Sequence, residues 1–168
     1  DADHQLSRSG DPGSRRDPAQ AVGGGRITGE ACHFVDLLRF LAGVPIHNYN
    51  VMSAFRSGDG KVLEDQVSVS LSFVDGSLGT IHYLANGHKS FPKERLEIFC
   101  GGRVLQLDNF RALGGFGWPS LKKMSLWRQD KGQIACVQAF LHSITEGLPS
   151  PIPAEQIFEV ARITLEAD

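Results

Sequence analysis

Apolar positions along the chain follow a helical spacing near the start, alternate through the middle, and return to a helical spacing near the end. The first pattern has four members at i, i+3, i+4 and i+7: Phe34, Leu37, Leu38 and Leu41. This spacing predicts a helix over residues 28–42 with one apolar face. Thr28 is the expected N-cap, and Gly43 and Pro45 are expected to end the helix.

The middle of the chain predicts antiparallel strands. Val67, Val69, Leu71 and Phe73 alternate with Ser68, Ser70 and Ser72. This period of two predicts a strand with an apolar face and a small polar face. Asp75-Gly76 and Gly101-Gly102 are expected hairpin turns. The other expected strands are Ile46–Phe55, Leu78–Ala85, Arg95–Cys100, Arg103–Leu107 and Leu121–Trp127.

Two further helices are expected after the strands. The first carries a stripe that stops before Gly147: Ile134, Val137, Leu141 and Ile144. The second covers Ala154–Ala167. Helices segregated from hairpin strands predict an α+β fold, with an open, predominantly antiparallel sheet and helices packed on one face. Residues 1–22 lack apolar periodicity and are expected to form a loop or disordered arm, which leaves 23–168 as a single domain.

Composition narrows the function classes. The 168 residues carry a formal charge of −2, which gives no electrostatic footprint for nucleic acid. No apolar run approaches the roughly 18 residues of a membrane helix. The cysteines are three in number and far apart (Cys32, Cys100 and Cys136), which favours reduced thiols and a cytoplasmic location. No His or Cys spacing suggests a metal site. The chain begins at Asp1 without Met, so we expect it to be part of a longer polypeptide.

Glu30 and His33 are the candidate catalytic pair. They are three residues apart on the first predicted helix, which makes them neighbours on its surface. Projected on that helix, both fall beside Leu37 and Leu41 and would face inward, which is costly unless they are paired or used. Histidine is the side chain best suited to proton transfer near neutral pH. The alternative is a structural histidine that bonds Glu30 or a backbone carbonyl.

The run from Gly23 to Gly43 resembles the signature helix of the Gfo/Idh/MocA oxidoreductases. It reads Gly-Gly-Gly-Arg-Ile-Thr-Gly-Glu-Ala-Cys-His-Phe-Val-Asp-Leu-Leu-Arg-Phe-Leu-Ala-Gly. In that family the second domain begins with a glycine-rich turn. A helix then carries a catalytic His and, three residues later, an Asp, which here is Asp36. An open antiparallel sheet and C-terminal helices follow, as in the element order predicted above.

This resemblance implies a substrate-binding and oligomerisation domain of an oxidoreductase that acts on a sugar, a sugar derivative or a polyol. His33 would be the acid/base, and the family's frequent Asp four residues before it is here Gly29. Glu30 is the expected replacement. NAD or NADP would come with an N-terminal nucleotide-binding domain that this chain lacks, so the chain alone is expected to bind neither. The alternative is a non-catalytic assembly or ligand-binding domain of the same fold.

Two further features carry expectations. The segment from Lys89 to Glu97, together with the Gly-Glu-Ala-Cys-His-Phe variant, resembles a bacterial subgroup in which an alcohol-dehydrogenase-like part is fused to the family's domains. Lys89, Lys93 and Arg95 could bind a sugar or carboxylate substrate, or could simply solvate a hairpin. In the resembling family the open sheet face forms the oligomer contact, so the serine face predicts a homo-oligomer, although a solvated face fits equally well.

Overall fold

The computed structural model describes residues 27–55 and 62–167, which form helices and two antiparallel sheets. This confirms the predicted α+β fold class. The chain divides into two compact units: a first unit of Asp1–Tyr83 and Val160–Asp168, and a second unit of Leu84–Glu159. The arm expected over residues 1–22 lies outside the described residues, and a single domain over 23–168 stays a prediction.

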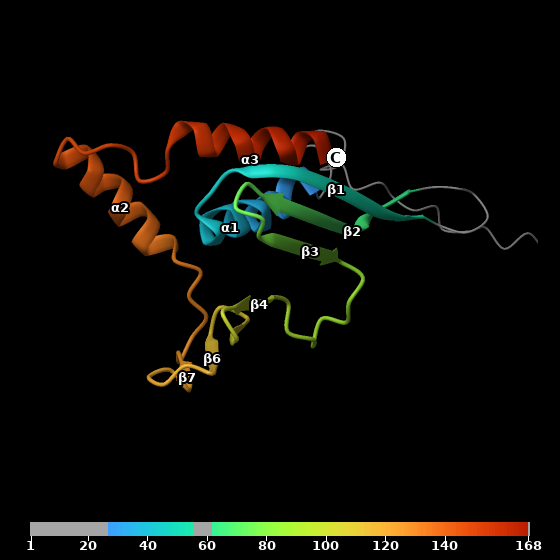
Figure 1. Ribbon diagram of the computed structural model, residues 1–168, viewed down its shortest axis with the longest axis horizontal. Coiled ribbons are helices and arrows are strands. Elements are labelled where there is room, and N and C mark those ends of the chain that lie inside the picture. The colour runs from blue at the N-terminus through green and yellow to red at the C-terminus, as the bar shows by residue number, and fades with distance from the viewer. Residues whose placement is uncertain (1–26, 56–61, 168) are drawn as a thin grey trace, which may run out of the picture. The chain divides into compact units, whose positions relative to one another are not determined.

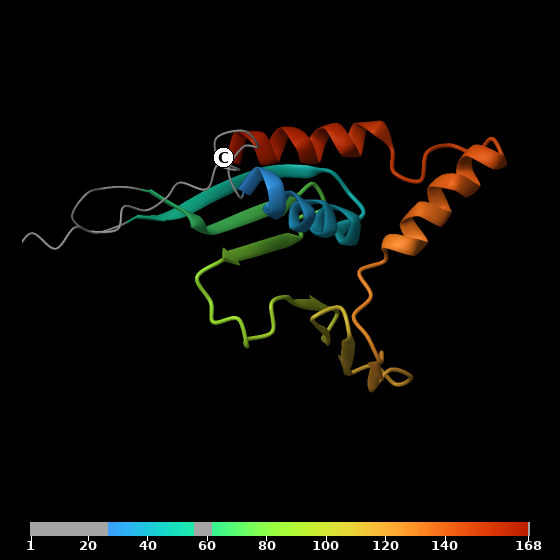
Figure 2. The same ribbon diagram turned by 180° about the vertical axis from the view of Figure 1, so that it is seen from behind.

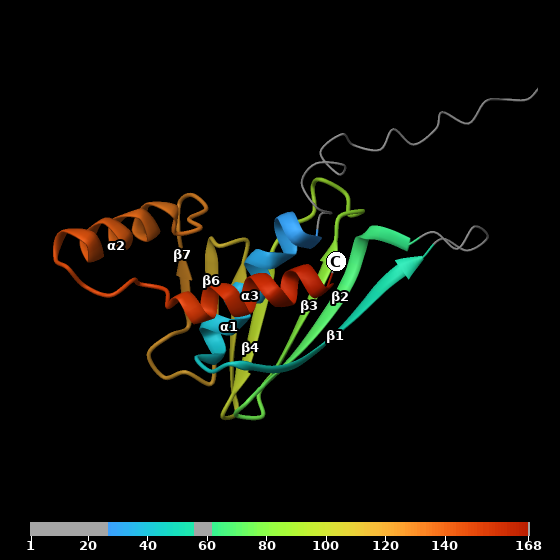
Figure 3. The same ribbon diagram turned by 90° about the horizontal axis from the view of Figure 1, so that it is seen from above.

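The first unit contains a three-stranded sheet with helices on one face. Its strands lie in the order β1-β2-β3 (Figure 1 and Figure 2). The helices are a π-helical turn η1, then α1, and the C-terminal part of α3, which passes over α1 in the view from above (Figure 3). The bounds are η1 Ile27–Ala31, α1 Cys32–Ala42, β1 Ile46–Phe55, β2 Val62–Phe73, β3 Leu78–Leu84 and α3 Ala154–Ala167.

One face of β2 forms the centre of the core. Its buried side chains are Val67, Val69, Leu71 and Phe73, each at most 4% exposed. They pack with buried residues of the helices and of β3, namely Ala31, Val35, Ile81, Val160 and Ile163. The serines between them lie on the opposite face, where Ser70 is exposed. The predicted division of this strand into an apolar and a small polar face is therefore confirmed.

The first helix differs from the prediction at its start and in its buried face. Thr28 is not an N-cap, because residues 27–31 form a π turn and α1 begins at Cys32 without a side-chain cap. Gly43 ends α1 as predicted, with a φ of 70°. The buried residues are Ala31 and Val35; Phe34 and Leu38 of the predicted stripe also pack against the core, whereas Leu41 is exposed. Small side chains on this face let the helix approach the sheet closely.

Gly79 makes that close approach possible. A Cβ built on Gly79 in β3 would lie 2.8 Å from Leu38 Cδ1 of α1. Any larger residue would push the helix or the leucine side chain away from the strand. Gly79 therefore leaves room for the Leu38 side chain of the helix that carries His33.

The second unit contains a four-stranded antiparallel sheet in the order β4-β5-β6-β7, and helix α2. The Gly101-Gly102 hairpin and α2, which ends before Gly147, are confirmed. Strand β6 was not predicted, and β7 is shorter than the expected strand Leu121–Trp127. The bounds are β4 Arg95–Cys100, β5 Arg103–Asp108, β6 Ala112–Phe116, β7 Lys123–Ser125 and α2 Gln133–Thr145.

The missed strand has a physical reason. β6 contains Gly114 and Gly115, and glycine inside a strand weakens the sequence pattern. A Cβ on Gly115 would lie 2.4 Å from the Leu121 carbonyl oxygen, so the chain needs glycine there for the two segments to meet. Within the described ranges, no helix is long and apolar enough to cross a bilayer.

Candidate functional site

Glu30 and His33 lie at the junction of η1 and α1. Glu30 is on the π turn, and His33 is the second residue of α1. π-helical turns occur frequently at functional sites because they change the direction in which side chains point. Glu30 and His33 are exposed, whereas Ala31 and Val35 of the same helical region are buried. The expectation that they face inward was therefore wrong, because the core takes the neighbouring helix face.

Tyr83 fixes the Glu30 carboxylate. The Tyr83 hydroxyl, at the end of β3, donates a hydrogen bond of 2.9 Å to Glu30 Oε2. Alternation places Tyr83 on the same strand face as the buried Ile81, which is the face that the helices cover. Sequence reasoning missed this contact because 53 residues separate the partners. Among the described residues, the pair that forms is Glu30–Tyr83, and no hydrogen bond joins Glu30 to His33.

Cys32, between the two candidates, is not suited to act as a nucleophile. Its partial burial raises the pKa of the thiol, and the nearby carboxylates of Asp36 and Glu30 raise it further. Backbone hydrogen bonds act in the opposite direction without reversing the shift. The thiol is the protonated form at neutral pH, and only the thiolate attacks.

The structure does not bring all three of the basic residues predicted to bind substrate to one place. Lys89 and Lys93 line a polar hollow of about 510 Å³ in the second unit. Arg95 does not line it: its Nε lies 2.8 Å from Asp108 Oδ1 across the β4–β5 pair. Hydrogen bonds from Gln106 and then Arg95 lower the pKa of Asp108. Arg95 thus has a structural partner, whereas Lys89 and Lys93 have no ion pair within the described part of the chain.

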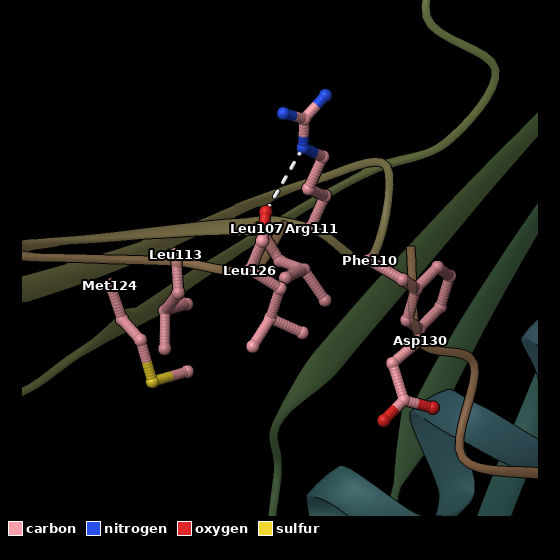
Figure 4. A pocket seen from close by; sticks show the side chains of 7 residues that line it. All are labelled: Leu107, Phe110, Arg111, Leu113, Met124, Leu126 and Asp130. Carbon is pink, nitrogen blue, oxygen red and sulfur yellow. Dashed lines mark hydrogen bonds between the residues drawn. The ribbon is translucent and has the colours of Figure 1, made fainter. Parts of the chain in front are cut away.

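A second hollow, of about 200 Å³, lies against the sheet of the second unit (Figure 4). Its wall is apolar, with the side chains of Leu107, Leu113, Leu126 and Met124 gathered on one side. The Arg111 guanidinium points away from them, and its Nε donates to the Leu126 carbonyl oxygen at 3.1 Å. Its two charged lining residues, Arg111 and Asp130, do not converge on one point, so this hollow offers mainly packing surface.

Comparison with known proteins identifies the family. The model of the GFO/IDH/MocA C-terminal domain matches residues 1–104. The chain belongs to the Gfo/Idh/MocA family. No curated protein sequence matches the chain at a significant level. The match includes the whole run from Gly23 to Gly43 as well as strands β1 to β4, so the resemblance noted in the sequence is confirmed.

Solved structures show the same fold at low sequence identity. The chain is similar to a UDP-N-acetylglucosamine 3-dehydrogenase from Acidithiobacillus ferrooxidans, with 16% identity and a TM-score of 0.68 over 90% of this chain and 48% of that one. It is also similar to an aldose-aldose oxidoreductase from Caulobacter crescentus, with 17% identity and a TM-score of 0.67 over 94% and 49%. A third structure, GenD2 from gentamicin A biosynthesis in complex with NAD, gives 22% identity and a TM-score of 0.61 over 88% and 46%. The chain thus spans about half the length of these proteins.

Proposed function

We propose that this chain is the substrate-binding and oligomerisation domain of an NAD- or NADP-dependent oxidoreductase that acts on a hydroxyl group of a sugar, sugar derivative or polyol. Family membership and the sugar-related names of the similar structures support this proposal. The observation that carries the site is the exposed pair at the start of α1, with Glu30 held by Tyr83 and His33 open to a substrate.

His33 is the proposed acid/base. Oxidation of a hydroxyl removes a proton from oxygen and a hydride from carbon, and His33 takes the proton on an imidazole nitrogen. Its exposure lets a substrate reach the ring. An imidazole titrates near neutral pH, which suits transfer in both directions. In the reverse reaction the same nitrogen returns the proton to the carbonyl oxygen.

Glu30 is proposed to bind the substrate together with His33. Tyr83 donates to Oε2, and no other described residue bonds the second carboxylate oxygen, so this oxygen is the one proposed to accept a hydrogen bond from a sugar hydroxyl. Gly29 stands where the family often has Asp, and a Cβ there would meet no atom within 4 Å. The site therefore has room for an aspartate that this chain does not use, and Glu30 supplies the carboxylate instead.

The described residues do not fit a dinucleotide. Such a site needs a glycine-rich turn between a strand and a helix. Here Gly114 and Gly115 lie inside β6, and Gly101-Gly102 joins two strands. We therefore assign no residue of the described chain to NAD or NADP. In this proposal the hydride acceptor is held by a nucleotide-binding domain that the described residues do not contain.

The serine face of the first unit is the proposed homo-oligomer contact. Strand register puts Asn50 and Met52 of β1 on the same face as Ser70 and Ser68. Met52 is 67% exposed, and Leu78 of β3 is 80% exposed. Small side chains at the centre allow another sheet to approach, and apolar side chains at the margins gain from being covered.

The test is turnover of a panel of sugars and polyols with NAD⁺ and NADP⁺, by the protein in its natural full length. His33→Ala should lower kcat about 10²- to 10⁴-fold, which is the usual contribution of general acid–base catalysis. His47→Ala, which removes another exposed histidine in the same unit, is the matched control and should leave kcat unchanged. An unchanged rate in His33→Ala would refute the proposed role.

Tyr83→Phe tests the positioning of Glu30. The hydroxyl is lost and the ring stays, so Glu30 keeps its charge but loses its hydrogen-bond donor. We expect a smaller loss than in Glu30→Gln, and mostly in KM. Absence of turnover in the wild type on every substrate would favour the alternative, a non-catalytic domain of the same fold.

A further inference from the structure

The polar hollow of the second unit is built by three segments that are distant in the sequence. The loop between β3 and β4 supplies Lys89 to Glu94, the β5–β6 turn supplies Asn109, and the segment before α2 supplies Gln129 and Lys131. Its volume of about 510 Å³ is in the range of small-molecule sites. Sequence reasoning found Lys89 and Lys93 but missed the other polar residues, because only the fold brings them together.

Glu94 joins the three segments. Its carboxylate accepts a hydrogen bond from Gln129 Nε2 at 3.2 Å and forms an ion pair with Lys131. Gln129 Nε2 also donates to Asn109 Oδ1 at 3.0 Å. The Glu94 side chain is only 17% exposed. The acid of the hollow is thus neutralised and used for structure, and it is not available to a ligand.

The remaining charge of the hollow is positive. Three lysines (Lys89, Lys93 and Lys131) against Glu94 leave a formal charge of +2. Within the part of the chain that the structure describes, Lys89 and Lys93 have no ion pair. Each ammonium group has three N–H donors. Ser90 and Asn109 add further polar groups at the same wall, and the exposed ring of Phe91 lies beside them.

The turn that presents Asn109 is held in an unusual backbone conformation. Asn109 and Phe110 both have positive φ, 52° and 47°. Asn tolerates this region, but a bulky residue such as Phe rarely adopts it. Two backbone hydrogen bonds fix the turn to its neighbours, from Asn109 N to the Glu94 oxygen at 2.7 Å and from Asp130 N to the Phe110 oxygen at 3.1 Å. The wall of the hollow is therefore preformed.

We propose that this hollow binds the anionic group, phosphate or carboxylate, of a sugar-derived ligand. Lys89 and Lys93 would contact the oxygen atoms directly, because both have free donors, and Lys131 would add charge while holding Glu94. Charge-assisted hydrogen bonds from ammonium groups to such oxygens are stronger than neutral ones. Arg95 is not part of this site, since Asp108 holds it. The inference rests on the proposed function only in taking the ligand to be a sugar derivative.

Calorimetric titration of the full chain with inorganic phosphate, glucose 6-phosphate, glucuronate and glucose tests the proposal. We expect at least one sugar anion to bind more tightly than glucose, and the affinity to fall as salt is raised. Lys89→Gln and Lys93→Gln should each weaken that binding about tenfold. Lys122→Gln removes a charge from the same unit outside the hollow and should change the affinity less than twofold.

The probes distinguish the two anions. Preference for glucose 6-phosphate assigns a phosphate group, and preference for glucuronate assigns a carboxylate. Equal binding of glucose and both anions, or the same loss in Lys122→Gln as in Lys93→Gln, would overturn the proposal. Retained melting temperatures show that the variants fold.

The experiments can refute the proposed function independently of the anion-binding proposal. Anion binding is measured without turnover, so His33→Ala should keep the anion affinity whether or not His33 is catalytic. Loss of anion preference with turnover intact would refute only the hollow. Loss of turnover in every assay with anion preference intact would refute only the oxidoreductase proposal.

Discussion

The two units have similar sheets but very different cores. All nine buried apolar residues of the described chain belong to the first unit. In the second unit β4 also alternates, yet its inward residues Leu96 and Ile98 are only half-buried, and Ser143 is the one buried residue of that unit among those described. The same period-two pattern has thus produced a closed core in one unit and an open apolar surface in the other.

The open surface of the second unit is clearest on α2. Ile134, Phe140 and Ile144 are 76%, 55% and 62% exposed, and Trp127 before the helix is 88% exposed. Apolar area of this kind is stabilising only when it is covered. The first unit can therefore hold Glu30 and Tyr83 in place by its own packing, whereas the second gains stability from whatever its apolar side chains meet.

A pair of leucine truncations should expose this difference most strongly. Leu71→Ala in β2 removes a side chain that is 1% exposed and leaves a cavity in the first unit, so we expect a loss of about 2–5 kcal/mol in the free energy of unfolding. Leu141→Ala in α2 removes a side chain that is 54% exposed, and about 0.5 kcal/mol is expected. Urea denaturation measures both.

Hydrogen exchange is the control for that comparison. Amides of β2 should exchange only on unfolding of the first unit, whereas α2 amides should exchange through local opening. If Leu141→Ala costs as much as Leu71→Ala, α2 is covered in solution, and the difference between the units is smaller than the structure indicates.

Two glycine substitutions test how the first unit seats its helix. Gly79→Ala would place a Cβ 2.8 Å from Leu38 Cδ1, and overpacking of this kind costs about 1–3 kcal/mol. Gly29→Ala meets no atom within 4 Å and should raise stability by up to about 1 kcal/mol, because alanine favours helix. If thermal or urea unfolding shows a loss of stability for Gly79→Ala and a gain for Gly29→Ala, the close contact between α1 and β3 is confirmed. Stability changes of the same sign would contradict it.

The sequence predicted the elements of both units well, and it predicted burial well only in the first. Strand β2 carries its apolar residues at alternate positions in a long unbroken run, so its face is unambiguous. On α1 the predicted stripe matches the core face only in part: Phe34 and Leu38 pack against the core, whereas Leu41 is exposed. The most buried positions of the helix region are Ala31 and Val35, which the stripe did not include.

The candidate site was predicted in part, for a related reason. Glu30 and His33 are close in sequence, so a local pattern can find them. Tyr83 and Lys131 reach the two sites only through tertiary structure, and no local signal marks them. Arg95 looked equivalent to Lys89 in the sequence, but the β4–β5 register places it opposite Asp108. Pairing across strands, which the sequence does not show directly, decides which charges are free.

Lowering the pH should reduce the stability of both units to a similar and small extent, in contrast to the core substitutions. Bonds from Tyr49 and then Arg162 lower the pKa of Glu166 in the first unit, and bonds from Gln106 and Arg95 lower that of Asp108 in the second. A carboxyl group with a lowered pKa adds stability above its ordinary pKa, and this stability is lost as the pH falls through the lowered value. The loss should therefore begin near the ordinary values of 4.5 for Glu166 and 3.8 for Asp108 and continue below them.

Urea midpoints measured between pH 7 and pH 2.5 test this expectation. Glu166→Gln and Asp108→Asn should each remove a small part of the acid dependence, because both groups lie at the surface, where solvent screens the interaction. Glu155→Gln, at the exposed start of α3, is the matched control and should leave the profile unchanged. A large effect confined to Asp108→Asn would mean that the second unit depends on this surface pair for the stability that its missing core does not supply.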